Sequence, residues 1–575
     1  MDRRALRRRQ GAEHVRGGSL NARSREYATR IAAPDTTATL DRRRFLRQGA
    51  AAMAALTVPA LAGCGGGSSP RRASRTVLRS TSGGLTEGVI IEKVPIDWRP
   101  LAKSLSGRLV LPSDHGYATA RELYDPRFDR IRPAAVAYCA SPADVQKTVD
   151  FARSHGIRPI PRGGGHSYGG YSTGTGLVID VTRMGSVTVT PARKGAPATA
   201  AVGAGARLVD FYDGLARANV LVPGGSCPTV GISGLALGGG IGVLARKYGL
   251  TSDAIRSLEV VTADGRLLRC SGAGHADLYW ASRGGGGGNF GVVTSFTFTA
   301  HPIPSQLTLF TVHWPWAAAD EALGGWIDWL RGAPDEVWSN FQLLSAGSSG
   351  LVAKSTGVFV GSKGALTALV NKLVASVGAA PSSTFVGGPD PYLHLMLVEG
   401  GCDGKSVAQC HLRSQNRAGM LQRSAYAAKS AYVGKPLPSA GLAAAVGAVE
   451  ELHSEHPGLG GGLVCDAYGG AVNRVPSGAT AFVHRGTICG IQMTVTWGSA
   501  PSGPAFAAGE AWLGSAAHAF APFTTGGAYQ NYIDPRLSNW QHAYYGSNLG
   551  RLTSVKRKYD PDNAFRFAQS IPLHA

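Results

Sequence analysis

Residues 162–171 read Arg-Gly-Gly-Gly-His-Ser-Tyr-Gly-Gly-Tyr, and the interpretation of the whole chain starts from this stretch. Successive glycines adopt positive φ without steric cost and let backbone N–H groups approach an anionic ligand. A diphosphate is the natural ligand of such a loop. His166 has mostly glycines around it in sequence, so its local side-chain packing is sparse and a role as a core histidine is disfavoured. By itself, a glycine-rich loop with one histidine is modest evidence for a functional site.

The residues before and after this loop predict a mixed helix and strand pattern. Residues 141–144 (Ser-Pro-Ala-Asp) combine an N-cap, a proline at the first helical position and an acid in the first turn, and Gly156 ends the helix. Residues 157–161 are extended and lead directly into the loop. Further elements are expected at 177–180 (strand), 206–219 (amphipathic helix) and 258–269 (two strands around an Asp-Gly turn). No G-x-G-x-x-G opens a helix after a strand, so a Rossmann site is not supported.

Two more glycine-rich segments follow. Residues 223–242 contain Gly-Gly-Ser-Cys-Pro-Thr-Val-Gly and end in Gly-Gly-Gly-Ile-Gly, and residues 283–294 contain an unbroken run of glycines. Cys227, between Gly-Ser and Pro, is expected on a loop and exposed to whatever that loop contacts. The alternative for this residue is a thiol without a function or one half of a disulfide. Each segment alone is weak evidence.

Together, in this order and spacing, the three segments resemble the berberine bridge enzyme-like FAD-linked oxidases of the vanillyl-alcohol oxidase/p-cresol methylhydroxylase (PCMH) superfamily. The resemblance is close over residues 115–300, loose over 305–520, and close again over 528–572. That last region contains Tyr-Gln-Asn-Tyr at 529–532 and Lys-Tyr-Asp-Pro-Asp-Asn-Ala-Phe at 558–565. The resemblance implies an α+β fold, with a two-subdomain PCMH-type FAD-binding domain and an α/β substrate domain whose antiparallel sheet is backed by helices.

The expected domain limits combine this resemblance with changes in sequence texture. After Pro302, strand-like runs at 307–314 and 487–497 alternate with helical runs at 319–331 and 365–377, which is typical of a sheet backed by helices. The expected divisions are a signal at 1–64, a flexible tether at 65–95, the FAD-binding domain at 96–304, the substrate domain at 305–525 and a C-terminal segment at 526–575 that returns to the FAD-binding domain.

The resemblance also implies the cofactor and its ligands. FAD would be attached through His166 to the flavin 8α-methyl group and through Cys227 to flavin C6, as in the bicovalent members of the family. Val230 matches a position where a small β-branched residue leaves room for O₂ at the flavin. No metal is expected. The full set of predicted cofactor-binding residues is Arg162, Gly163, Gly164, Gly165, His166, Ser167, Cys227, Val230, Gly231, Gly234, Gly238, Gly239, Gly240, Gly242, Val293 and Asn531.

Chemistry of this family would move a hydride from a substrate C–H bond to the flavin, while a base takes the hydroxyl proton and O₂ is reduced to H₂O₂. The predicted catalytic residues are Tyr529 and Tyr532, with Tyr529 as the base and flavin packing as the alternative role for both. A phenol with a pKa near 10 is a poor base at pH 7, so a cationic neighbour is expected to lower the pKa of Tyr529. His484 and Arg485 are the candidates for that neighbour. Gln492 and Thr494 alternate along one strand and are expected to face the substrate.

The N-terminal segment predicts export. Asp41 to Arg47 (Asp-Arg-Arg-Arg-Phe-Leu-Arg) resembles a twin-arginine signal, and the apolar run at 49–62 is shorter than the about 20 residues that span a bilayer. Leu61-Ala62-Gly63-Cys64 resembles a lipobox, with Cys64 as the lipidated residue and the membrane contact limited to that lipid. The alternatives are a disordered basic tail or a start codon placed too far upstream. The twin-arginine route carries folded proteins, which suits a protein that must bind FAD before it leaves the cytoplasm.

The charge and the cysteine content agree with an exported enzyme that acts on small molecules. The net charge of +21 comes from 58 Lys/Arg and 37 Asp/Glu residues. Residues 1–80 contain 17 of the Lys/Arg residues and 5 of the Asp/Glu residues. The rest of the chain is only mildly basic and has no stripe of Lys/Arg interleaved with aromatics, so no nucleic-acid partner is expected. Eight cysteines fit an oxidising compartment, and Cys402 and Cys410 bracket a short loop suited to a disulfide, although pairing cannot be deduced from sequence.

Three functions are compatible with these residues. The first is an oxidase of alcohols, sugars or glycosides that uses O₂. The second is a dehydrogenase with the same flavin and another electron acceptor. The third is a non-catalytic surface lipoprotein that keeps the fold.

Overall fold

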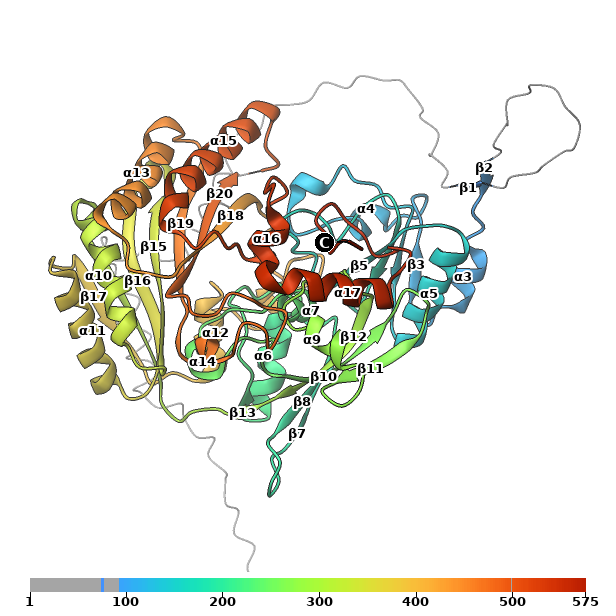
Figure 1. Cartoon of the computed structure of the whole chain (residues 1–575), viewed down its shortest axis with the longest axis horizontal. Helices are drawn as coiled ribbons and strands as arrows, with labels where there is room; N and C mark the ends of the chain where they lie inside the picture. The colour runs from blue at the N-terminus through green and yellow to red at the C-terminus, as the bar shows by residue number, and fades with distance from the viewer. Residues whose placement is uncertain (1–73, 77–92, 498, 575) are drawn as a thin grey trace, which may run out of the picture.

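The computed structural model describes residues 74–76, 93–497 and 499–574 (Figure 1). The twin arginines and Cys64 lie outside these residues. Strand β1 (Ser74–Thr76) pairs with β2 (Lys93–Pro95) as a separate two-stranded ribbon. Within the described part of the chain, no helix combines the length and the apolar character that crossing a membrane requires.

A four-stranded sheet in the order β3-β4-β6-β5 carries the first glycine loop. Strands β4, β6 and β5 are parallel, and β4 and β6 have almost entirely buried side chains, as parallel strands covered on both faces require. Because β5 ends at Arg162, the loop begins at the carboxyl edge of these strands. The Ser141 hydroxyl accepts a hydrogen bond from the Asp144 N–H, which confirms the predicted N-cap. The elements are α3 (Arg99–Ser104), β3 (Arg108–Val110), α4 (Tyr117–Ala120), β4 (Ala135–Tyr138), α5 (Pro142–Ser154), β5 (Pro159–Arg162) and β6 (Leu177–Asp180).

A five-stranded antiparallel sheet in the order β11-β10-β12-β8-β7 follows. The predicted Asp-Gly turn joins β10 to β11, with the Gly265 N–H donating to the Thr262 carbonyl. The elements are β7 (Val187–Thr190), β8 (Thr199–Gly203), α6 (Leu208–Arg217), α7 (Ile232–Leu237), α8 (Ala245–Tyr248), β10 (Ile255–Val261), β11 (Leu267–Ser271), α9 (Ala276–Ala281) and β12 (Val292–Thr299), with β9 (Val220–Leu221) paired to β13 (His301–Pro302).

The third sheet has seven antiparallel strands in the order β17-β14-β16-β15-β19-β20-β18. Helices α10, α11, α13 and α15 cover its face away from the two smaller sheets (Figure 1). Buried and half-buried residues alternate along β20, so one face packs on helices and the other faces the rest of the molecule. The elements are β14 (Leu307–Trp314), α10 (Ala319–Gly332), β15 (Val337–Ser345), β16 (Leu351–Val360), α11 (Lys363–Val377), β17 (Ser383–Val386), α12 (Tyr392–Glu399), β18 (Ala425–Val433), α13 (Ser439–Glu455), β19 (Gly460–Ala467), α14 (Gly470–Arg474), β20 (Cys489–Trp497) and α15 (Gly503–Phe520).

The chain ends with α16 (Trp540–Tyr545) and α17 (Leu549–Tyr559), and α17 packs against α9. Lys556 is buried on α17, and its Nζ donates to the Asn289 carbonyl of the third glycine segment at 2.7 Å. The C-terminal residues therefore brace that segment. The predicted α+β class, with a helix-backed antiparallel sheet, is confirmed, whereas the domain limits stay a prediction.

Candidate active site

One cavity of about 570 Å³ brings the separate sequence segments together. Its walls come from the loop after β5, the segment around Cys227, the third glycine segment, and residues 529–533. A volume in this range suits a cofactor or a substrate of similar size. The sequence-predicted residues that line it are Arg162, Gly163, Gly164, Gly165, His166, Ser167, Cys227, Val230, Gly231, Gly234, Val293, Gln492, Tyr529, Asn531 and Tyr532.

Four predicted cofactor-binding glycines and one predicted substrate residue do not line this cavity. They are Gly238, Gly239, Gly240, Gly242 and Thr494. The glycines instead allow close packing behind the wall. A Cβ on Gly238 would lie 1.9 Å from Asn531 Oδ1, and one on Gly242 would lie 1.6 Å from the Gly224 carbonyl oxygen. Thr494 lies two residues beyond Gln492 on the same half-buried face of β20.

The loop after β5 presents an electropositive backbone to the cavity. Within the described residues, no hydrogen-bond acceptor is found for the backbone N–H groups of residues 163–167. Gly165 has φ +72°, a conformation that favours glycine. Arg162 is buried and paired with Asp180 at 2.6 Å, and its Nη1 has no partner in the described part of the chain. These donors fit the diphosphate of FAD.

Two arginines are also among the residues that line the cavity. Arg158 and Arg566 line this cavity and also a second one of about 390 Å³. Burial and then the nearby charge of Arg566 lower the pKa of Arg158. Neither guanidinium forms an ion pair with a carboxylate among the described residues. An anionic group in the cavity would relieve this repulsion.

His166 is held by residues far away in sequence. Its ring stacks on Tyr124 with centroids 4.1 Å apart, and its Nε2 forms a hydrogen bond with Thr229 Oγ1 at 2.9 Å. Burial, followed by the charge of Arg207, lowers the pKa of His166 to about 3, although a hydrogen bond with the Thr229 backbone opposes this. His166 is therefore neutral at physiological pH. The neighbouring glycines contribute no side chains to its packing, and Tyr124 and Thr229, both distant in sequence, supply the contacts instead.

The two predicted attachment residues share one neighbour. Cys227 is exposed, as predicted for a loop thiol, and its Sγ lies 3.9 Å from the same Thr229 Oγ1. Because both side chains contact the same threonine hydroxyl group, the His166 ring and the Cys227 thiol lie close together. Thr229 belongs to the glycine-rich motif at residues 223–242, but the sequence alone predicted no role for it.

Tyr529 accepts hydrogen bonds from backbone and side-chain N–H groups. Its hydroxyl oxygen receives the Gly240 N–H at 2.8 Å and Asn531 Nδ2 at 2.9 Å. Burial raises the pKa of Tyr529 to about 12, and these hydrogen bonds act in the opposite direction. Neither expected cationic neighbour contacts this hydroxyl: Arg485 pairs with Asp253 at 2.8 Å, and His484 stacks on Tyr432. Burial lowers the pKa of His484 to about 3, so it carries no charge to offer.

Further aromatic residues complete the wall near Gln492. Gln492 Nε2 donates to the Tyr168 hydroxyl at 2.8 Å, and the Tyr168 ring stacks on Tyr532 with centroids 5.4 Å apart. Tyr426 packs edge-on against Tyr168. Asp466 of β19 is the carboxylate whose charge raises the pKa of Tyr529, Tyr532 and Tyr168, after the larger effect of burial.

Sequence reasoning missed Tyr124, Tyr426 and Asp466. Nothing local marks them, because the pairing order of β18, β20 and β19 is what brings Tyr426 against Tyr168 and the charge of Asp466 within range of Tyr529 and Tyr532. Tyr168 was within the quoted loop and could have been proposed. Within the described residues, no group of three or more His, Cys, Asp or Glu side chains is arranged to hold a metal ion.

Comparison with known proteins agrees with this site. Residues 133–271 match the family model described as FAD binding domain, and residues 528–572 match the model described as berberine and berberine like. The FAD-linked oxidoreductase YgaK of Bacillus subtilis is 33% identical over 81% of this chain and 97% of its own. The solved BBE-like 1 of Physcomitrella patens is 32% identical, with a TM-score of 0.74 over 84% of this chain and 100% of its own. The xylooligosaccharide oxidase of Myceliophthora thermophila C1 is 26% identical, with a TM-score of 0.72 over 83% and 99%.

Fold, cavity and relatives define an FAD-dependent oxidoreductase. The chain belongs to the berberine bridge enzyme-like family of FAD-linked oxidoreductases.

Proposed function

We propose that this enzyme is an exported oxidase that removes hydride from a CH–OH group of a sugar, glycoside or other alcohol and passes the electrons to O₂, giving H₂O₂. The FAD would be attached at His166 and Cys227. The observation that carries the proposal is the shared contact of both side chains with Thr229 at the wall of one cavity, with Tyr529, Tyr532 and Gln492 also lining it.

His166 suits covalent attachment because it is neutral and its ring orientation is held. Nε2 forms the hydrogen bond with Thr229, and Nδ1 contacts no partner among the described residues. When Nε2 carries the proton, Nδ1 is the nucleophilic atom. The stack on Tyr124 keeps the ring in this orientation.

Flavin supplies hydride acceptance and reaction with O₂ when it is bound, and the chain supplies the proton transfer. A buried phenol with a pKa of about 12 takes a proton at pH 7 only if it passes its own proton on. We assign Asp466 as the group that receives it, since its charge acts on both Tyr529 and Tyr532. The ring centroids of these two tyrosines are 4.9 Å apart.

A hydroxylated ring substrate is supported by the wall of tyrosines and by the Gln492–Tyr168 pair. Aromatic rings pack on the apolar face of a sugar, and the amide and hydroxyl groups bond to its oxygens. The structurally similar xylooligosaccharide oxidase was solved with xylobiose. Export by the twin-arginine signal, with a lipid at Cys64, is part of the proposal, and the disulfide between Cys402 and Cys410 fits an oxidising compartment.

A panel of mono- and oligosaccharides and simple alcohols, followed by peroxide release, tests the oxidase. One H₂O₂ per oxidised substrate is expected. Reduction of a dye without peroxide would identify the dehydrogenase instead, and a protein that is yellow yet unbleached by every substrate would favour the non-catalytic alternative.

Attachment is tested by acid precipitation. His166→Ala and Cys227→Ala should each lose one link, and the double variant should release all flavin into the supernatant. Flavin that stays with the precipitated double variant would refute the attachment sites. For the base, Asp466→Asn and Tyr529→Phe should both lower kcat.

A further inference from the structure

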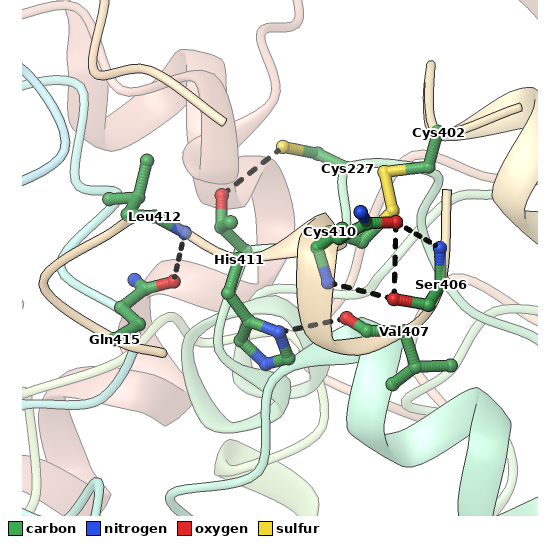
Figure 2. The surroundings of a disulfide bond; sticks show 10 residues. Cys227, Cys402, Ser406, Val407, Cys410, His411, Leu412 and Gln415 are labelled. Atoms are coloured by element: carbon green, nitrogen blue, oxygen red, sulfur yellow. Dashed lines mark hydrogen bonds between the residues drawn. A yellow bond between two sulfur atoms is a disulfide. The ribbon is translucent and has the colours of Figure 1, made fainter. Parts of the chain in front are cut away.

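The segment closed by the disulfide lies against the loop that carries Cys227. Cys402 and Cys410 form a disulfide with Cα atoms 6.0 Å apart, eight residues apart in sequence. Figure 2 shows the Cys227 side chain beside this disulfide, directed toward His411. We refer to residues 400–411, which follow α12, as the disulfide segment.

The disulfide segment contacts both neighbours of Cys227 at close range. A Cβ on Gly400 would lie 2.9 Å from the Ser226 carbonyl oxygen and 3.3 Å from Pro228 Cδ. The two pieces of backbone therefore pack directly, without a side chain between them. Movement of Gly400 would be transmitted to the residues on either side of Cys227.

The same helix supports the disulfide segment and the Cys227 loop. Cys402 and Cys410 are fully buried against Val209 in the first turn of α6. The Val209 N–H donates to the Pro228 carbonyl at 3.0 Å.

The contact with α6 continues at the end of the segment. His411, which is 4% exposed, forms a hydrogen bond through Nε2 with Asp210 Oδ2 at 3.1 Å and another through Nδ1 with the Val407 carbonyl at 2.9 Å. The first turn of α6, the disulfide segment and the Cys227 loop thus form one packed unit.

We propose that the disulfide segment positions Cys227 for attachment to the flavin, which makes Cys402 and Cys410 positioning residues for the second covalent link. This inference rests on the proposed function, in which Cys227 bonds to a flavin ring carbon. That attachment is a two-electron oxidation: the S–H and C–H bonds break, the S–C bond forms, and O₂ takes up the two electrons and the two protons to become H₂O₂.

The expected effect is selective for Cys227. An exposed thiol on a Gly-Ser-Cys-Pro loop needs its backbone held, because bond formation requires the reacting atoms within about 3–3.5 Å and a misplacement of about 1 Å costs on the order of 100-fold in rate. His166 is oriented by Tyr124 and Thr229, and neither belongs to the disulfide segment. Opening the disulfide should therefore lower attachment at Cys227 and leave attachment at His166.

The test compares full-length His166→Ala with the same protein carrying Cys402→Ser and Cys410→Ser, after expression with FAD under air. In this background Cys227 is the single proposed anchor, so flavin retained after acid precipitation measures that link alone. We expect the serine variant to retain at most about one tenth of the flavin that His166→Ala retains. In the protein with His166 intact, peptide mass spectrometry should show flavin on the peptide with His166 and a reduced share on the peptide with Cys227. General destabilisation would lower both attachments together.

A second pair of variants keeps the disulfide intact. Gly400→Ala should press on Ser226 and lower attachment at Cys227, whereas Gly447→Ala, on α13 with no atom within 4 Å of the new Cβ, should not. This pair decides the question if the serine variant fails to fold. Equal flavin on Cys227 in all folded variants would overturn the inference and leave the proposed function intact. His166→Ala without any bound flavin would refute the second link of the proposed function, and the inference with it.

Discussion

Lys556→Met should loosen the third glycine segment from the C-terminal residues. The Lys556 ammonium group is fully buried and donates to the Asn289 carbonyl, Asp560 Oδ2 and the Phe565 carbonyl at 2.6–2.7 Å. The variant removes the positive charge that pairs with the buried Asp560 carboxylate and the ammonium donor of two buried carbonyl groups. Removing one partner of a buried ion pair costs about 3–5 kcal/mol, since the remaining charge stays desolvated.

Native-state hydrogen exchange measures this loss of local stability at individual backbone amides. The amides of Ala564 and Phe565 donate to the Asp560 carboxylate, and the amide of Ile571 donates to Asn289 Oδ1. A local opening free energy lower by about 3–5 kcal/mol corresponds to exchange faster by about 10² to 4 × 10³-fold at these amides. Lys558→Met is the matched control, because Lys558 lies on the same helix but its ion pair with Asp277 is exposed. Equal exchange in the two variants would refute the reasoning.

Three further outcomes are expected. Gly238→Ala should lower activity, because its Cβ would lie 1.9 Å from Asn531 Oδ1 and displace the amide that bonds to the tyrosine hydroxyl, while Gly550→Ala, with open space around it, serves as the control in the same assay. His484→Phe should reduce the loss of stability on acidification. Burial lowers the pKa of His484 to about 3, so between about pH 6.5 and pH 3 the unfolded chain binds a proton at this residue that the native chain does not. Thermal unfolding of the variant and the parent protein at pH 7 and pH 5 measures the difference. A steeper acid loss in this variant would contradict that sign. Arg158→Met should stabilise the protein without FAD by relieving repulsion from Arg566, yet weaken non-covalent FAD binding about tenfold in a variant without attachment residues, as measured by fluorescence titration.

The sequence by itself determined the features that depend on local backbone chemistry. The glycine runs predicted loops that approach an anion, and residues 163–167 do present N–H groups without intramolecular acceptors among the described residues. The alternation over residues 487–497 predicted that Gln492 and Thr494 share a face of one strand, and β20 has that pattern. The C-terminal motifs predicted the class of cofactor because they accompany the glycine segments in one family.

Only the tertiary structure decided what surrounds each reactive group. His166 obtains its low pKa from burial and the charge of Arg207, and its fixed orientation from Tyr124 and Thr229. The two residues predicted to be cationic neighbours of Tyr529 contact Asp253 and Tyr432 instead. Strand order brings Asp466 close enough for its charge to act on the tyrosines, and period-two patterning does not encode that order. A pKa depends on burial and on charges within a few ångström in space, and residues far apart in the chain supply both. The protonation states of the cavity residues therefore follow from the tertiary structure and not from the local sequence.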